Sequence, residues 1–276
     1  MEIDHHTSYN PDMTTHITKS SILSGLRCPK RLWLQTNQPE LAEPSSTSKL
    51  TIANGNEVGA IARLNYPRGI LIEHVMQPDL AVAETARLIA NSPSVPLFEA
   101  VFVYAGVLVR ADILSPTGNG WRMVEVKSSG SVKDHHLLDC AIQLWVAEGA
   151  GINVQQFCVA HVDTGFMYAG DGNYAQMLIE EDVSERVRAL LPEVPAWLAN
   201  HRDILDNPMP SIKMGAQCKP DCQFKAYCEL GLTEYPVSIL PNGRKVITDL
   251  QEAGIEDVRD IPDGVLTNER HLTVWQ

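Results

Sequence analysis

The spacing of hydrophobic residues changes along the chain, and the change separates predicted helices from predicted strands. In the first third, apolar positions recur every three to four residues, which is typical of helices that bury one face. This spacing predicts helices over 19–27, 30–34, 51–65 and 79–91, and a loop over 37–48. Thr18 is a suitable cap for the first helix, and Pro29 bends the chain before the second.

The middle of the chain is rich in Val, Phe and Ile, which favour strands. Three strands are predicted in succession, over 96–104, 107–114 and 121–127, and Ala105-Gly106 between the first two predicts a hairpin turn. A helix, a strand and a proline-interrupted helix are predicted next, over 134–148, 156–162 and 182–205. This order predicts an α/β fold with a mixed sheet flanked by helices.

Three parts of the chain differ in pattern. Residues 1–17 are polar and aperiodic, so we expect them to be disordered. Residues 18–232 hold the predicted sheet and all the cysteines, and we expect them to form one domain. Residues 233–276 predict two short helices around a glycine turn, which we interpret as a small tail or a linker to a further domain.

Composition limits the function classes. The chain has 276 residues, 22 Lys and Arg against 34 Asp and Glu, and a formal net charge of −12. An acidic surface disfavours general nucleic-acid binding, so an anionic substrate would need a local basic patch or a metal ion. The sequence contains neither a signal-peptide pattern nor an apolar run of membrane-spanning length. We therefore expect a cytoplasmic protein that does not contact a membrane and has reduced cysteines.

Asp112, Glu125 and Lys127 are charged residues in strands that are otherwise apolar, where an unpaired charge is costly. Residues two apart on a strand share a face, and hairpin pairing can bring Asp112 beside Glu125. Two adjacent carboxylates repel each other, and a bound Mg²⁺ or Mn²⁺ would remove the repulsion. A nearby lysine can orient or help deprotonate a water, or stabilise charge on a phosphoryl oxygen. The alternative is a set of solvated or mutually paired charges.

Three further side chains are candidates for the same site. Glu57 belongs to the helix that precedes the sheet, Glu99 begins the first strand of the meander, and Gln143 lies on the following helix. Alternatively, Glu57 and Glu99 are surface acids, and Gln143 is an ordinary residue on one face of its helix.

Cysteines form a second group. Cys218, Cys222 and Cys228 fall within eleven residues, and three close thiols in a reducing compartment indicate a metal site whose best fourth ligand is Cys28. This three-plus-one spacing is less typical of Zn²⁺ than of a 4Fe-4S cluster, which we prefer, with structural Zn²⁺ as the alternative. Such a link would stabilise the fold by roughly 5 kcal/mol if it acts like a disulfide. Cys140 and Cys158 lie in apolar segments and are expected in the core.

Basic residues gather around these cysteines in the sequence. They are Lys19, Arg27, Lys30, Arg31, Lys219 and Lys225. Two interpretations remain open: a surface for the DNA backbone, or compensation of the negative charge of a thiolate cluster.

Together these motifs resemble the RecB-like branch of the PD-(D/E)XK nucleases. Asp112, Glu125-Val126-Lys127 and Gln143, flanked by the four cysteines, are similar to the iron–sulfur exonucleases, namely the CRISPR-associated adaptation nucleases and AddB-type nuclease domains. The stretches 17–34, 55–63, 109–114 and 124–143 resemble a bacterial protein family with the same nuclease front half.

The resemblance implies a restriction-endonuclease-like core and a role for each motif residue. Asp112, Glu125 and the carbonyl of Val126 would hold Mg²⁺ or Mn²⁺, and Lys127 would be the catalytic lysine. Gln143 would match the glutamine of the helical motif, and Glu57 stands where many relatives have a histidine.

Two functions follow as hypotheses. The first is a metal-dependent deoxyribonuclease, acting as an exonuclease on single-stranded DNA or DNA ends, with a structural cluster. The second is an inactive, cluster-stabilised module that binds DNA or protein partners within a larger nuclease system.

Overall fold

The computed structural model describes residues 16–43, 46–74, 76–91, 94–174, 176–215, 218 and 221–275, and gives no side-chain description for 46–52. Within these residues, seven strands form one mixed sheet in the order β2-β3-β4-β5-β6-β7, with β1 paired to β4. The strands are β1 (Ile17–Thr18), β2 (Ile70–Leu71), β3 (Leu97–Tyr104), β4 (Val107–Pro116), β5 (Trp121–Lys127), β6 (Val154–Val162) and β7 (Leu178–Asp182).

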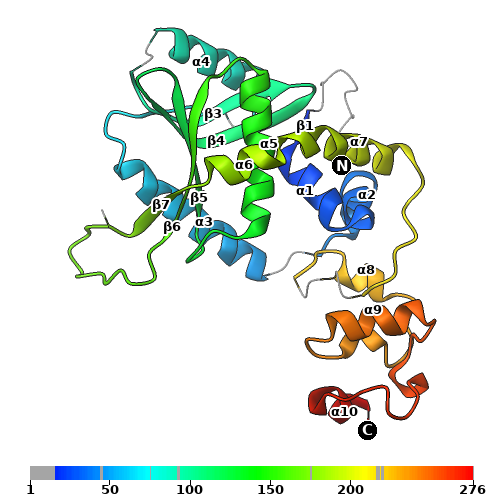
Figure 1. Ribbon diagram of the computed structural model, residues 1–276. Coiled ribbons are helices and arrows are strands. Elements are labelled where there is room, and N and C mark those ends of the chain that lie inside the picture. The colour runs from blue at the N-terminus through cyan, green and yellow to red at the C-terminus, as the bar shows by residue number, and fades with distance from the viewer. Residues whose placement is uncertain are drawn as a thin grey trace, which may run out of the picture.

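Helices lie on both faces of the sheet and in a separate C-terminal part (Figure 1). They are α1 (Lys19–Arg27), α2 (Pro29–Asn37), α3 (Ser46–Leu64), α4 (Pro78–Asn91), α5 (Asp134–Gly149), α6 (Ser184–Leu190), α7 (Val194–Asp206), α8 (Lys225–Glu229), α9 (Arg244–Glu252) and α10 (Glu269–Trp275). Four 3₁₀ turns connect them: η1 (Pro39–Leu41), η2 (Leu191–Glu193), η3 (Val237–Ile239) and η4 (Val258–Asp260).

The central hairpin forms where the sequence predicts it. β3 and β4 are antiparallel, and the turn residues Ala105 and Gly106 both have positive φ, at 50° and 79°. Positive φ at both central positions matches the right-handed twist of hairpin strands, and the glycine adopts it without strain. β4 then pairs antiparallel with β5, and β5 pairs parallel with β6 through the crossover helix α5. The expected α/β fold with a mixed, helix-flanked sheet is confirmed.

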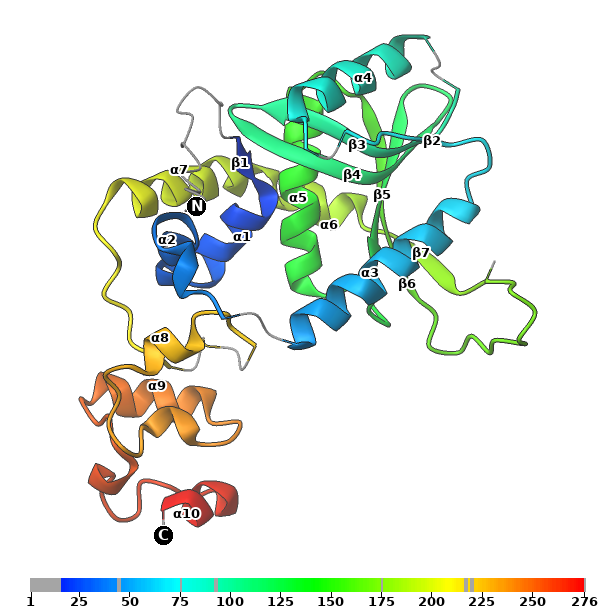
Figure 2. The ribbon, with the colours of Figure 1, turned by 180° about the vertical axis from the view of Figure 1, so that it is seen from behind.

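The two faces of the sheet have separate cores. The larger core joins α1, α4, α5 and α7 to one face, where residues such as Met123, Leu144 and Val159 are fully buried. On the other face, Ala62 of α3 packs on Phe98 and neighbouring side chains. Figure 2 shows α3 crossing this second face. Alternation along β5 therefore directs Glu125 and Lys127 toward the α5 face.

Short elements were missed because they carry little periodic pattern. β1, β2 and β7 are two to five residues long, and Ile17, predicted to be disordered, belongs to β1. Residues 1–15 of that predicted segment lie outside the described residues. α3 begins at Ser46, within the predicted loop, and the helix predicted over 182–205 is divided by η2 into α6 and α7.

The C-terminal part has its own apolar core. Val237, Leu250 and Leu266 are buried together with neighbours from 240–261. Figure 1 shows α9 and α10 at one end of the molecule, beyond α8. The domain boundary near residue 233 remains a prediction. Within the part of the chain that the structure describes, no helix is both long and apolar enough to span a bilayer.

Candidate functional site

The site forms where β4 and β5 separate. β4 pairs with β5 only over 113–116, and nearer its start it pairs with β1 instead. Asp112 lies at the point of separation, and Glu125 and Lys127 end β5 beside it. At this fork the two strands no longer pair through their backbones. A cavity of about 310 Å³ opens there. Its lining residues are Gly55, Asn56, Gly59, Arg63, Glu99, Asp112, Ile113, Glu125 and Val126.

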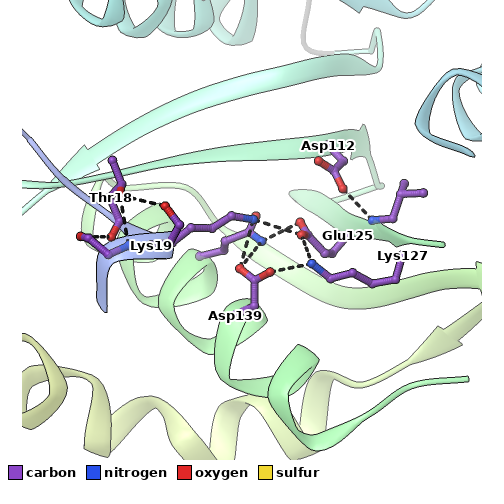
Figure 3. A network of polar contacts seen from close by, with 10 residues as sticks. Thr18, Lys19, Asp112, Glu125, Lys127 and Asp139 are labelled. Atoms are coloured by element: carbon purple, nitrogen blue, oxygen red, sulfur yellow. Dashed lines mark hydrogen bonds and ion pairs between the residues drawn. The ribbon is translucent and has the colours of Figure 1, made fainter. Parts of the chain in front are cut away.

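Asp112 bridges the gap between the strands. Its Oδ2 accepts a hydrogen bond of 2.7 Å from the backbone N–H of Val126 (Figure 3). Since the N–H and C=O of one strand residue point to the same side, the Val126 carbonyl also faces Asp112. Burial raises the pKa of Asp112 to about 8, and the negative charge of Glu125 adds to the shift.

Glu125 is the most enclosed acid of the site, with 3% of its surface exposed. Its Oε1 accepts hydrogen bonds from Lys127 Nζ at 2.6 Å and Lys19 Nζ at 3.0 Å, and its Oε2 accepts one from Gln143 Nε2 at 2.6 Å. Burial would raise the pKa of Glu125, but the two ammonium groups outweigh it and hold the pKa well below its usual range. Glu125 is therefore ionised, while its neighbour Asp112 is the protonated member of the pair near neutral pH.

Lys127 is fixed from two directions. Besides Glu125, its Nζ donates to Oδ2 of Asp139 on α5 at 2.6 Å. Burial would lower the pKa of Lys127, but the two carboxylates outweigh it and raise the pKa well above its usual range. Lys127 thus stays protonated at neutral pH and acts as a cation and hydrogen-bond donor rather than as a base.

Glu99 joins the site through an unusual backbone conformation. It lies between Phe98 and Ala100, which pair with Ile113 and Ala111 on either side of Asp112. Its φ of 58° is strained for a glutamate. This strained residue, Glu99, lines the cavity. Its carboxylate lies 3.8 Å from Arg63 of α3 and 4.0 Å from Arg110 of β4. Burial raises the pKa of Glu99, and the two arginines only partly oppose the shift.

Glu57 does not join these residues. It is exposed on α3 and is not among the residues that line the cavity, whereas its neighbours Gly55, Asn56 and Gly59 are. On a helix, a step of one or two residues turns the side chain to another face. The structure therefore does not bring Glu57 to Asp112 and Glu125.

Two residues of the site were missed from the sequence. Asp139 lies one helical turn before Gln143, so the i, i+4 spacing on one face would have indicated it. Lys19 was instead grouped with the basic residues around the cysteines, but its Nζ lies 3.0 Å from both Glu125 Oε1 and Asp139 Oδ1. Lys19 and Glu125 are 106 residues apart in the sequence, so no local sequence pattern predicts their contact.

The four predicted cysteines lie around one small cavity. Cys28, at the junction of α1 and α2, faces Cys218, Cys222 and Cys228 from the C-terminal segment, and Arg27, Arg31, Leu34 and Phe224 complete the lining. Burial raises the pKa of Cys218 and of Cys228. The Nε of Arg31 is buried without a hydrogen-bond partner among the described residues. Cys140 and Cys158 are buried in the core, as predicted.

Among the described residues, no three His, Cys, Asp or Glu side chains are grouped closely enough to hold one metal ion. At the fork, the lysines lie against Glu125, and the third ligand expected there is a backbone carbonyl.

Comparison with known proteins adds little to this geometry. No family model and no curated protein matches the chain. Among solved structures, the crystal structure of SSO0001 is similar, with 16% sequence identity, a TM-score of 0.34, and coverage of 83% of this chain and 92% of that chain. A likeness this weak supports no functional conclusion.

Proposed function

We propose that the chain is a metal-dependent deoxyribonuclease with a RecB-like PD-(D/E)XK core, which hydrolyses phosphodiesters in single-stranded DNA or at DNA ends. One observation carries the proposal. Asp112, Glu125 and Val126 line a single cavity at the strand fork, and Lys127 is hydrogen-bonded to Glu125 beside it. DNA as substrate and the cytoplasm as compartment belong to the same proposal.

The residues at the fork fit a hard divalent cation. Asp112 and Glu125 supply carboxylate oxygens, and Val126 supplies a carbonyl that faces Asp112. Burial and the negative charge of Glu125 raise the pKa of Asp112, and a divalent cation bound beside it would oppose both effects. Bound Mg²⁺ or Mn²⁺ would activate water and neutralise charge on the phosphate.

The remaining polar residues position the reacting groups. Lys127, held by Asp139 and Glu125, can donate a hydrogen bond to a phosphoryl oxygen as charge develops on it. Gln143 fixes the second oxygen of Glu125 and so sets the orientation of the carboxylate. Arg63 lines the cavity beside Glu99 and can meet a flanking phosphate.

For the cysteine group we propose a structural 4Fe-4S cluster, with Zn²⁺ as the alternative. Four thiols around one cavity supply the required soft ligands. The buried Nε of Arg31 finds no acceptor among the described residues, and a buried donor normally has a partner, which a bound cluster would supply. Bound metal would also hold the buried thiols as thiolates, against the raised pKa of Cys218 and Cys228. Iron and zinc analysis of anaerobically purified protein distinguishes the two.

An inactive binding module is the second candidate. It is favoured by the two lysines on Glu125, which compensate the site in the absence of a metal ion. Cleavage activity separates the two candidates directly.

The test is a time course on end-labelled single-stranded and double-stranded DNA, with Mn²⁺, with Mg²⁺ and with EDTA. The proposal predicts metal-dependent cleavage by the wild type and loss of at least about a thousandfold in rate for Glu125→Gln. An exposed variant, Glu229→Gln on α8, serves as the matched control and should cleave like the wild type. Equal cleavage by Glu125→Gln would remove the assignment, and an inert wild type would favour the binding module.

A further inference from the structure

Lys19 reaches the proposed metal site from outside the sheet. It is the first residue of α1, and its Nζ lies 3.0 Å from Glu125 Oε1 and 3.0 Å from Asp139 Oδ1 (Figure 3). Lys127 bonds the same Oε1 at 2.6 Å. One carboxylate oxygen therefore faces two ammonium groups, and its other oxygen is bonded to Gln143.

The two lysines hold their positions for different reasons. Lys127 is two residues from Glu125 on the same strand, so the pleat of β5 keeps both side chains on one face. Lys19 is carried by a separate helix, which packs against α2, α5 and α7. A shift of α1, or a rotamer change in Lys19 alone, would therefore remove this ammonium and leave Lys127 in place.

An ammonium group and a divalent cation compete for the same carboxylate. Each stabilises negative charge on Glu125, and two cations on one oxygen repel each other strongly in a half-buried site. The side chain of Lys19 is 23% exposed, against 3% for Glu125, so the lysine is more accessible to solvent than the acid that it contacts.

We propose that Lys19 is an internal counter-cation that competes with the divalent cation for Glu125, so that α1 sets the metal concentration at which the site fills. The inference rests on the proposed function, because the competing cation is the one expected at Asp112 and Glu125. Lys19 acts through Glu125 and is in this sense a positioning residue. A merely structural ion pair would instead stabilise the fold and leave metal affinity unchanged.

Helix α1 also connects Lys19 to the cysteine group. The helix begins with Lys19 in the carboxylate site and ends at Arg27, and Cys28 follows directly in the cysteine cavity. A group bound by the four cysteines would hold the far end of the helix that carries the competing lysine.

The experiment is a titration with Mn²⁺ alone, without DNA, in which free Mn²⁺ is followed by electron paramagnetic resonance. Five proteins are compared: wild type, Lys19→Met, Lys19→Gln, Lys19→Arg and Glu125→Gln, each checked for folding by circular dichroism and thermal unfolding. Removal of the charge in Lys19→Met and Lys19→Gln should tighten Mn²⁺ binding by about tenfold or more, and Lys19→Arg should bind like the wild type. Lys245→Met, an exposed lysine on α9, controls for the loss of net charge and should also bind like the wild type.

Each outcome has one meaning. Unchanged or weaker binding in a folded Lys19→Met or Lys19→Gln protein would overturn the inference and leave the proposed nuclease site intact. Absence of Mn²⁺ binding in the wild type, or full binding in Glu125→Gln, would instead refute the metal site itself.

Discussion

The carboxylate site at the strand fork and the cysteine cavity differ in how their polar groups are compensated. At the fork, Glu125 and Asp139 alternate with Lys19 and Lys127, so that these charges hold each other in place. Around the cysteine cavity, burial raises the pKa of Cys218 and Cys228, and the Nε of Arg31 has no hydrogen-bond partner within the part of the chain that the structure describes.

This difference indicates what each region requires to keep its shape. Ion pairs between side chains hold Glu125, Asp139 and the two lysines of the fork together, while burial keeps the pKa of Asp112 and of Glu99 raised there. Four thiols from distant segments have no such mutual attraction, so we expect the cysteine region to depend on a bound metal group. α1 connects the two regions, because Lys19 begins it and Cys28 follows its end.

The largest effect should follow loss of a cysteine ligand. Cys28→Ser would remove one ligand of the proposed cluster and with it the proposed link between the N-terminal helices and the C-terminal segment, which by loop closure would stabilise the fold by roughly 5 kcal/mol. We expect loss of bound iron and a marked fall in the thermal unfolding midpoint. The matched control is Cys158→Ala, a core cysteine, which should keep its iron. Normal iron content in Cys28→Ser would show that the cysteine cavity is not a metal site.

The second largest effect should follow replacement of Lys127. Lys127→Met removes the charged donor that Asp139 and Glu125 hold, and should reduce kcat by about a hundredfold to a thousandfold. Lys127→Arg should recover part of the rate, and exposed Lys133→Met should cleave like the wild type. A loss confined to KM for DNA would mean that Lys127 binds DNA rather than stabilising the reacting phosphate.

The raised pKa of Asp112 predicts that the stability of the metal-free protein depends on pH. The pKa of Asp112 is raised to about 8 in the folded state, above its ordinary unfolded value, so its stabilising contribution is present at low pH and is lost as the pH rises toward 8. Asp112→Asn lacks this loss. Between pH 5 and pH 9, the unfolding free energy of the wild type should therefore fall by about 4 kcal/mol relative to that of Asp112→Asn. Urea unfolding at several pH values measures the difference. Mn²⁺ should restore wild-type stability at high pH, and parallel curves for the two proteins would contradict the burial of an uncompensated carboxyl group.

The smallest effect concerns the support of Lys127. Asp139→Asn keeps the shape of the side chain but weakens one of the two bonds that orient Lys127, and should lower kcat about tenfold with little change in KM. Asp134→Asn, an exposed change on the same helix, is the control. Equal rates for the two variants would show that Asp139 does not position the lysine.

Much of the fold could be predicted because the long elements have clear hydrophobic periods. The hairpin, the third strand and α5 lie close to their predicted bounds, since each alternates or repeats over at least seven residues. β1 and β2 are two residues long, and their place is determined by the strands beside them rather than by their own sequence.

The site was predictable only as far as local geometry reaches. Glu125 and Lys127 share a strand face, and a hairpin partner supplies Asp112, so these three follow from pleat and pairing. Lys19 depends on how α1 packs against the rest of the fold, and the inward turn of Glu99 depends on a positive φ that glutamate rarely adopts. Such features arise from tertiary packing and carry no local sequence pattern.

The most direct measurement is anomalous X-ray diffraction from crystals soaked in Mn²⁺. The central claim predicts an anomalous peak at the strand fork, bonded to the carboxylates of Asp112 and Glu125 and to the carbonyl of Val126, and absent from Asp112→Asn crystals. A Mn²⁺ peak elsewhere, with none between Asp112 and Glu125 at saturating metal, would contradict the claim.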